Sequence, residues 1–431
     1  MVLPVLSALL VLPFLVLAHP TPNSDGPEVV KRSLPSRWYQ ERGHPVEKLF
    51  MRQTEPTDGV NYPAIGSPQW SQGYPPVPPD PTQMPQEWTN ALNAAVNAGK
   101  IPNIPPSTST NPQNPTPVYE GVNPGDPSVC SASYGCRAPG DIWDAPNGTI
   151  GISFDDGPSL GSDLLYTFLE GNKIPSTHFM IGTNILNNPT LFSRAFQELH
   201  SDIAVHTWSH RYMTTLSNAE VVAEFGWTME IIKNSTGGRL PRYWRPPYGD
   251  TDNRVRAIAS EVFGLQTIIW NHDTLDWSLT TQGGTTAEAI NASMTQWLTG
   301  PKSPGLLILE HELTDNSAQA FIDAYPLIST TGWNILSTAQ MEGQTVYLNS
   351  KDGLSPVQPF NGVLGAQYSN TPTTSSTVVP SSTAPPPAPS NTTANSNTSQ
   401  SDKNKNGSTQ SFVSKLAGVL GGMILTVAFY A

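Results

Sequence analysis

Two histidines four residues apart, His206 and His210, and two adjacent acids, Asp155 and Asp156, have the types and spacing for metal chemistry. On one helical turn or a tight loop, both imidazoles can face one point. One carboxylate would complete a two-histidine, one-carboxylate site that leaves positions open for water and substrate. Adjacent residues of a strand point to opposite sides, so the paired acids are poorly explained as core. One could bind the metal while the other takes a proton from water, or both could simply cap a helix or lie on a solvated loop.

Further polar or aromatic residues follow other predicted strands. Arg245 and Tyr248 come after a short apolar run, Asp276 and Trp277 after the next, and His311 after a third. Polar clusters at the carboxyl ends of several different strands converge on one mouth in a βα barrel, whereas an open doubly wound sheet uses one switch point. The pattern therefore favours a barrel. An aromatic residue such as Trp208 or Trp277 could form the base of a sugar-binding site or simply pack within the protein.

Strand-like and helix-like segments alternate through the middle of the chain, which predicts a parallel sheet. The predicted strands are Thr149–Phe154, Thr177–Ile181, Ile203–Val205, Tyr243–Trp244, Leu265–Trp270, Leu306–Leu309 and Trp333–Leu336. The predicted helices between them are Ser162–Glu170, Pro189–His200, Ser217–Lys233, Asp252–Glu261, Thr285–Leu298 and Ser317–Thr330. We expect an α/β fold, a distorted (β/α)7-type barrel with a Pro-rich N-terminal extension and a disordered Ser/Thr/Pro C-terminal stalk.

Over about residues 145–340, these clusters resemble, in order, the motifs of the polysaccharide deacetylases of carbohydrate esterase family 4, and fungal chitin deacetylases in particular. The resemblance implies metal-dependent hydrolysis of N-acetyl groups on β-linked sugars. It implies that Asp155 is the general base and His311 the general acid. The metal ligands it implies are Asp156, His206 and His210.

The same resemblance gives supporting roles to five more residues. Arg245 would orient Asp155, and Asp276 would be the partner of His311. The Tyr248 backbone N–H would help hold the oxyanion, while Trp277 and Leu309 would line the pocket for the acetyl methyl group. The metal would be Zn²⁺ or Co²⁺, both of which suit two histidines and a carboxylate.

We therefore expect a hydrolase acting on the carbon–nitrogen bonds of linear amides, with chitin, an N-acetylglucosamine polymer, as substrate. Two alternatives stay open. One is a related esterase acting on another acetylated polysaccharide such as acetylxylan. The other is a non-catalytic cell-wall mannoprotein, although every metal and acid/base position is filled.

Composition limits the partners and the size of the folded domain. Charged residues make up 13% of the chain and the formal net charge is -12, which excludes the basic surface of a nucleic-acid binder. Most of the 43 prolines fall before residue 147, and the flanks are expected to bury little. The expected organisation is a signal peptide (1–18), a Pro-rich region (19–125), a catalytic domain (126–350), a Ser/Thr/Pro/Asn-rich stalk (351–406) and a removed anchor signal (407–431).

Both ends of the sequence carry targeting patterns. Met1–Ala18 is an apolar run typical of a secretory signal peptide, and Lys31-Arg32 is either a dibasic processing site or a solvated pair. Small residues, a polar spacer and the apolar run Leu416–Ala431 are typical of a GPI anchor, with a single short membrane span as the alternative. Asn406 is the best attachment residue, with Asn404 or Ser401 as alternatives. We expect a secreted protein held at the cell surface.

A secreted protein is expected to carry covalent modifications, and the sequence predicts two kinds. Cys130 and Cys136 enclose a short segment and are expected to form a disulfide, since a metal pair would lack partner cysteines. Six Asn-x-Ser/Thr sequons predict N-glycosylation, though not at every site. They begin at Asn147, Asn234, Asn291, Asn391, Asn397 and Asn406.

Overall fold

The computed structural model describes residues 57–108 and 116–360. The predicted signal peptide, the Lys31-Arg32 pair, most of the stalk and the anchor signal lie outside these residues, as do Asn391, Asn397, Ser401, Asn404 and Asn406. Within the described part of the chain, no helix is both long enough and apolar enough to cross a membrane.

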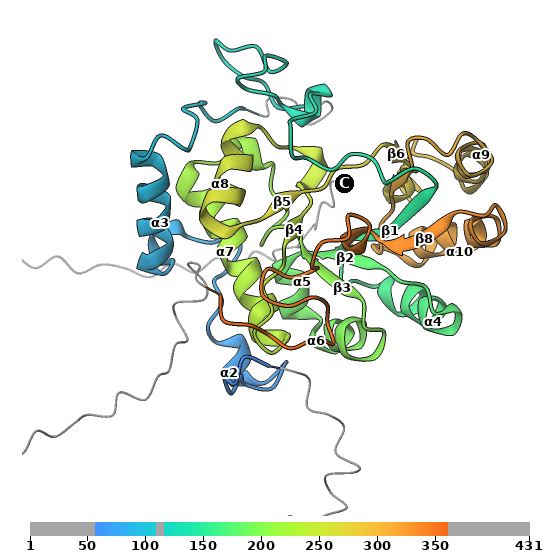
Figure 1. Cartoon of the computed structure of the whole chain (residues 1–431), viewed down its shortest axis with the longest axis horizontal. Coiled ribbons are helices and arrows are strands. Elements are labelled where there is room, and N and C mark those ends of the chain that lie inside the picture. The colour runs from blue at the N-terminus through green and yellow to red at the C-terminus, as the bar shows by residue number, and fades with distance from the viewer. Residues whose placement is uncertain (1–56, 109–115, 361–431) are drawn as a thin grey trace, which may run out of the picture. The chain divides into compact units, whose positions relative to one another are not determined.

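A curled parallel sheet forms the centre of the fold (Figure 1). Its strands are β1 (Thr149–Gly157), β2 (Thr177–Met180), β3 (Asp202–Val205), β4 (Tyr243–Trp244), β5 (Gln266–Thr267), β6 (His272–Asp273), β7 (Leu306–Leu309) and β8 (Asn334–Ser337). They are ordered β5-β4-β3-β2-β1-β7-β6, and β8 also pairs with β1. The sequence prediction of a distorted (β/α)7-type barrel is confirmed.

One predicted strand is wrong in its extent. Leu265–Trp270 was expected to be one strand, but only the two residues of β5 within it are a strand, and a further short strand, β6, follows after residues 268–271. Asn271 lies in the break and bonds across to β7: its side chain accepts from the Leu307 backbone N–H at 3.0 Å. β5 therefore pairs with β4, whereas β6 pairs with β7 at the other end of the strand order. This makes β5 and β6 the two edges of the sheet.

Helices cover the outside of the sheet, because most strands are followed by an amphipathic segment that buries one face. They are α4 (Ser162–Asn172), α5 (Gly182–Asn187), α6 (Pro189–Ser193), α7 (Asn218–Ser235), α8 (Asn253–Phe263), α9 (Ala287–Leu298) and α10 (Asp315–Thr330). α7 begins with a capping box, in which Ser217 and Glu220 satisfy each other's backbone N–H. α10 packs against α4 on one side and α9 on the other.

Residues 57–108 contribute to the core, so the expectation that the N-terminal flank buries little is wrong for this segment. Helix α3 (Gln86–Asn97) packs against α7 and α8, where Figure 1 shows it in blue. Trp88 is fully buried, and Trp70, on the short α2 (Pro68–Ser71), is also buried. The proline-rich composition does not indicate this packing, because the surface against which α3 packs belongs to α7 and α8, more than 100 residues further along the chain.

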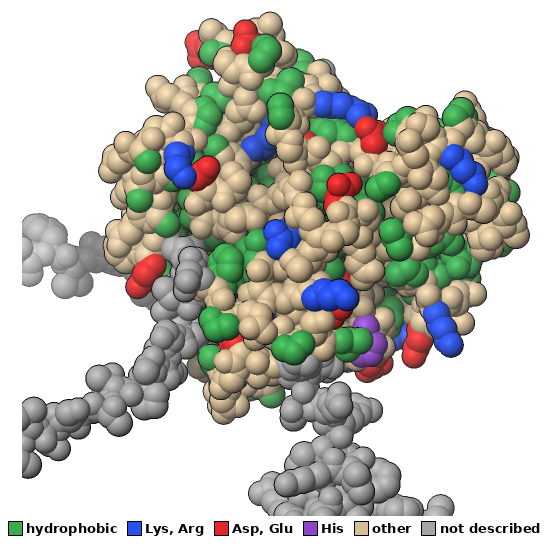
Figure 2. Space-filling view, viewed as in Figure 1, with side chains coloured by type: hydrophobic (Ala, Val, Ile, Leu, Met, Phe, Trp, Pro, Cys, Tyr) green, Lys and Arg blue, Asp and Glu red, His purple; other side chains and the backbone are tan. Residues whose placement is uncertain are grey.

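The surface carries few charges. On the face drawn in Figure 2, lysine, arginine and acidic side chains are scattered among polar and apolar ones. The low charged fraction of 13% is consistent with this view.

The buried Trp88 gives a test of the N-terminal packing. A Cβ on Gly226 of α7 would lie 2.3 Å from a Trp88 ring carbon, so ring and helix are in close contact. Trp88→Ala should lower the free energy of unfolding by about 3–5 kcal/mol, since it leaves a large cavity. Val96→Ala, at an exposed position of the same helix, should cost less than about 0.5 kcal/mol. Chemical denaturation of both variants measures this, and equal midpoints would contradict the packing.

Candidate active site

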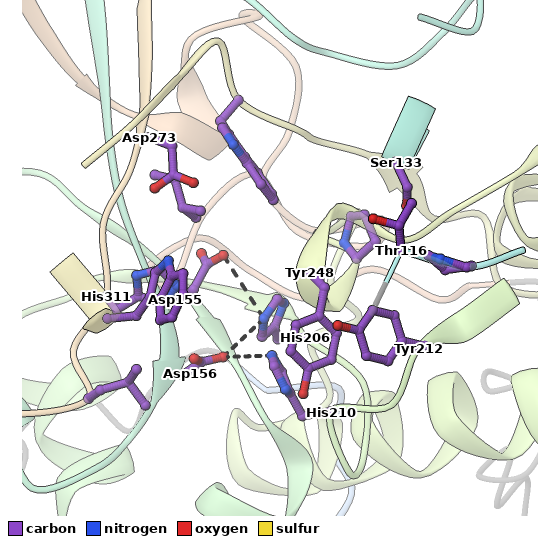
Figure 3. A pocket seen from close by; sticks show the side chains of 16 residues that line it. Thr116, Ser133, Asp155, Asp156, His206, His210, Tyr212, Tyr248, Asp273 and His311 are labelled. Atoms are coloured by element: carbon purple, nitrogen blue, oxygen red, sulfur yellow. Dashed lines mark ion pairs between the residues drawn. The ribbon is translucent and has the colours of Figure 1, made fainter. Parts of the chain in front are cut away.

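Three side chains at the carboxyl end of the sheet meet at one point (Figure 3). Asp156 is near the end of β1, while His206 and His210 belong to the loop after β3. The Nε2 atoms of His206 and His210 each lie 3.1 Å from Asp156 Oδ1. One ligand atom from each residue lies within 4.8 Å of the others, close enough for all three to hold one metal ion.

The donor set fits a divalent cation. The His206 ring is fixed by a 2.8 Å contact between Nδ1 and the Arg245 carbonyl, which directs Nε2 toward Asp156. Asp156 Oδ1 is buried and accepts no hydrogen bond among the described residues, so it is open to a cation. Burial raises the pKa of Asp156, but the neighbouring His210 and His206 outweigh it and hold the pKa well below its ordinary value. The carboxylate is therefore ionised, as a ligand must be.

Backbone strain is concentrated around the same cluster. Asp156, Thr207, His210 and Tyr248 have φ between 57° and 70°, a region that residues other than glycine seldom occupy. Such strain persists only where the surrounding structure enforces it, and it is common at functional sites. At His210 the Thr207 hydroxyl supports the turn by accepting the backbone N–H at 3.1 Å.

Asp155 forms a buried ion pair with Arg245. Arg245 Nη1 donates to Asp155 Oδ1 at 2.7 Å and to Ser153 Oγ at 3.1 Å, and Nη2 donates to the Ile269 carbonyl. Burial lowers the pKa of Arg245, while Asp155 acts in the opposite direction. The other carboxylate oxygen, Oδ2, lies 4.0 Å from His206 Nε2 and is thus beside the proposed metal position.

His311 follows β7 and is held by Asp276. The two carboxylate oxygens of Asp276 accept from the His311 ring at Nδ1 (2.7 Å) and from its backbone N–H (2.8 Å). Burial lowers the pKa of His311, but Asp276 outweighs it, together with Asp156 and Asp155, and raises the pKa to about 10. The ring is therefore protonated at neutral pH. Nε2 remains available to the cleft that His311 lines.

A cleft of about 310 Å³ joins these groups. Of the residues predicted from the sequence, those lining it are Asp155, Asp156, His206, His210, Tyr248, Trp277, Leu309 and His311. Arg245 and Asp276 lie behind this surface, against Asp155 and His311. Trp208, which could have floored the site, instead packs inside: it is fully buried and stacks on Tyr74 with ring centroids 5.7 Å apart.

Other lining residues had been given no role from the sequence. They are Thr116, Pro117, Ser133, Tyr212, Pro246, Trp270, Asp273 and Leu313. Tyr212 stacks on Tyr248 with centroids 4.0 Å apart, and its place two residues after His210 could have indicated it. Thr116 and Pro117 come from the Pro-rich region and give no such signal.

The predicted covalent sites differ in their surroundings. Cys130 and Cys136 form a disulfide, and Ser133 between them lines the cleft. Asn147 and Asn291 are exposed, whereas Asn234 is half-buried and donates to the Tyr74 hydroxyl at 3.0 Å. N-glycosylation at these positions stays a prediction.

Comparisons with known proteins identify the class. Residues 144–267 match the polysaccharide deacetylase family model. Chitin deacetylase 3 of Cryptococcus neoformans is 39% identical over 355 residues, covering 81% of this chain and 83% of the relative. The chitin deacetylase of Amylomyces rouxii is 35% identical over 252 residues, covering 56% of this chain and 57% of the relative. A family 4 carbohydrate esterase from Streptomyces lividans, solved with acetate, is 30% identical with a TM-score of 0.39, covering 47% of this chain and 97% of that one.

The chain belongs to the polysaccharide deacetylases of carbohydrate esterase family 4. Members of this family depend on a metal ion, and Asp156, His206 and His210 form a site that can hold one.

Metal affinity tests this cluster directly. His206→Ala should weaken Zn²⁺ binding by at least about 100-fold, because even residues that only support a metal ligand typically contribute 10–100-fold. Titration calorimetry on metal-stripped protein measures the affinity. His272→Ala is the matched control, since this histidine stacks on Trp297 outside the cluster. Unchanged affinity in His206→Ala would contradict the assignment.

Proposed function

We propose that this protein hydrolyses the N-acetyl groups of N-acetylglucosamine residues in chitin, giving chitosan and acetate. The observation that carries the proposal is the placement of Asp155 and His311 on the walls of one cleft beside the Asp156, His206 and His210 cluster. The printed names of the Cryptococcus and Amylomyces relatives support chitin as the substrate.

Asp155 is the proposed general base. Arg245 holds one of its oxygens by a hydrogen bond of 2.7 Å, which leaves the other oxygen to take a proton from the attacking water. A divalent cation, Zn²⁺ or Co²⁺, bound by Asp156, His206 and His210 would polarise the acetyl carbonyl and lower the pKa of water. The Tyr248 backbone N–H is proposed to stabilise the charge that develops on the carbonyl oxygen.

His311 is the proposed general acid. When the carbon–nitrogen bond breaks, the departing nitrogen must gain a proton, because an amide anion is a very poor leaving group. His311 is protonated at neutral pH and can donate from Nε2 while Asp276 holds Nδ1. Water supplies the hydroxyl of the new acetic acid group, and the sugar leaves as a free amine. Trp277 and Leu309 would surround the acetyl methyl group.

The substrate can be decided by one comparison. Acetate release from chitin pentamer and from acetylxylan should be measured at matched acetyl concentrations. The proposal expects release from the pentamer to be faster. Faster release from acetylxylan would favour the related esterase, and no release from either would favour the non-catalytic wall protein.

We also propose that the protein is secreted and attached to the cell surface by a GPI anchor, with Asn406 as the attachment residue. The apolar runs Met1–Ala18 and Leu416–Ala431 support this, together with the polar spacer before the second run.

The role of His311 predicts a substrate-dependent defect. His311→Ala should lower kcat on chitin pentamer by about 10²–10⁴-fold, the usual cost of losing a general acid. The loss should be much smaller on an activated acetyl ester, whose leaving group needs no proton. Metal content should stay unchanged. Equal losses on both substrates would mean that His311 is not the acid.

The Asp276 contact predicts a shift in pH dependence. The protonated form of His311 is the active one, so activity should be present below its pKa and fall as the pH rises through about 10. Asp276→Asn removes the main interaction that raises this pKa, so the alkaline limb of kcat should move to lower pH. Asp315→Asn, at an exposed acid, should leave the limb in place. An unmoved limb in Asp276→Asn would contradict the pairing.

A further inference from the structure

A second histidine–carboxylate pair lies behind the cleft, outside the proposed machinery. His178 of β2 and Glu312, the residue after His311, are both fully buried. His178 Nδ1 lies 2.8 Å from Glu312 Oε1. Neither side chain lines the cleft.

Both partners are held by additional hydrogen bonds. Ser162 Oγ donates to the other Glu312 oxygen at 2.5 Å, and Ser176 Oγ lies 3.0 Å from His178 Nε2. A Cβ on Gly157, at the end of β1, would lie 1.8 Å from Glu312 Oε1. Only glycine at this position leaves room for the carboxylate to pass beneath β1 and reach β2.

The main chain at this point joins the two proposed proton carriers. The Asp155 N–H donates to the Glu310 carbonyl at 3.0 Å, and the Glu312 N–H donates to the Asp155 carbonyl at 3.1 Å. His311 lies between these two backbone hydrogen bonds, which make a parallel β-bridge between His311 and Asp155. The backbone of Glu312 therefore holds the segment that carries His311 against β1. The side chain of Glu312 holds the same segment against His178 of β2.

We propose that the Glu312–His178 pair is a positioning device, which sets the place of the His311 ring relative to the Asp155 carboxylate. This inference rests on the proposed deacetylase function. A buried hydrogen-bonded pair contributes little net stability compared with apolar groups of the same shape, so stability alone is a weak reason for it. Misplacing a catalytic group by about 1 Å can lower the rate by about 100-fold.

The central variant is Glu312→Met, which keeps the length of the side chain and removes its hydrogen bonds. Glu312→Gln is the conservative rescue, because its oxygen can accept from His178 and its amide can donate to Ser162. Asp202→Leu is the matched control. Asp202 is a buried carboxylate at the start of β3 that does not line the cleft. It accepts from Ser337 Oγ and from Gln340 Nε2, and it interacts with His178 through its charge.

Acetate release from chitin pentamer should be measured on zinc-loaded proteins at a temperature where circular dichroism shows every variant folded. Glu312→Met should lower kcat by about 100-fold, with KM and bound zinc almost unchanged. Glu312→Gln should recover most of that loss. Asp202→Leu should lower the melting temperature and leave kcat within about twofold of the parent protein.

If Glu312→Met does not fold, the double variant Glu312→Met with His178→Phe replaces the pair by apolar groups and should restore folding without restoring kcat. A folded variant lacking the pair with a kcat near that of the parent would overturn the proposal. So would an equal loss of kcat in Asp202→Leu. A parent protein that releases no acetate would instead contradict the proposed function itself.

Discussion

Two adjacent carboxylates are buried at the end of β1, and much of the surrounding structure compensates for them. Asp155 and Asp156 are only 2% and 6% exposed. Burying an ionised carboxylate without a partner is very costly, so each needs its own source of positive charge. Asp155 receives it from Arg245, and Asp156 from the two histidines and the cation they can hold. This separation gives two neighbouring acids different chemical environments and therefore different proposed roles.

The parallel sheet makes this compensation possible. The partners of the β1 acids follow two other strands, the histidines after β3 and Arg245 after β4, and these parallel strands end at the same edge as β1. The partners are themselves fixed by buried contacts, such as the one between His206 Nδ1 and the Arg245 carbonyl. His311 follows the same rule with Asp276 on its ring and Glu312 beside it in the chain. Rigidity of this kind preorganises charged groups before a substrate arrives.

Much of this could be predicted from the sequence because the signals are local. The alternation of apolar runs and amphipathic segments gave the barrel, and polar residues at strand ends gave the acids and histidines of the cleft. The remainder depends on contacts between distant segments. The break between β5 and β6 reflects the bonding of Asn271 to β7, and Thr116 reaches the cleft from a proline-rich region. Trp88 and Trp208 are buried by partners that no local pattern specifies.

The central claim is that a single metal site between Asp155 and His311 carries amide hydrolysis. Acetate release from chitin pentamer should be followed in protein stripped of metal, verified as metal-free, and then titrated with Zn²⁺ or Co²⁺. The account predicts no turnover without metal and full recovery after one equivalent has bound. Full activity in the verified metal-free protein would contradict it.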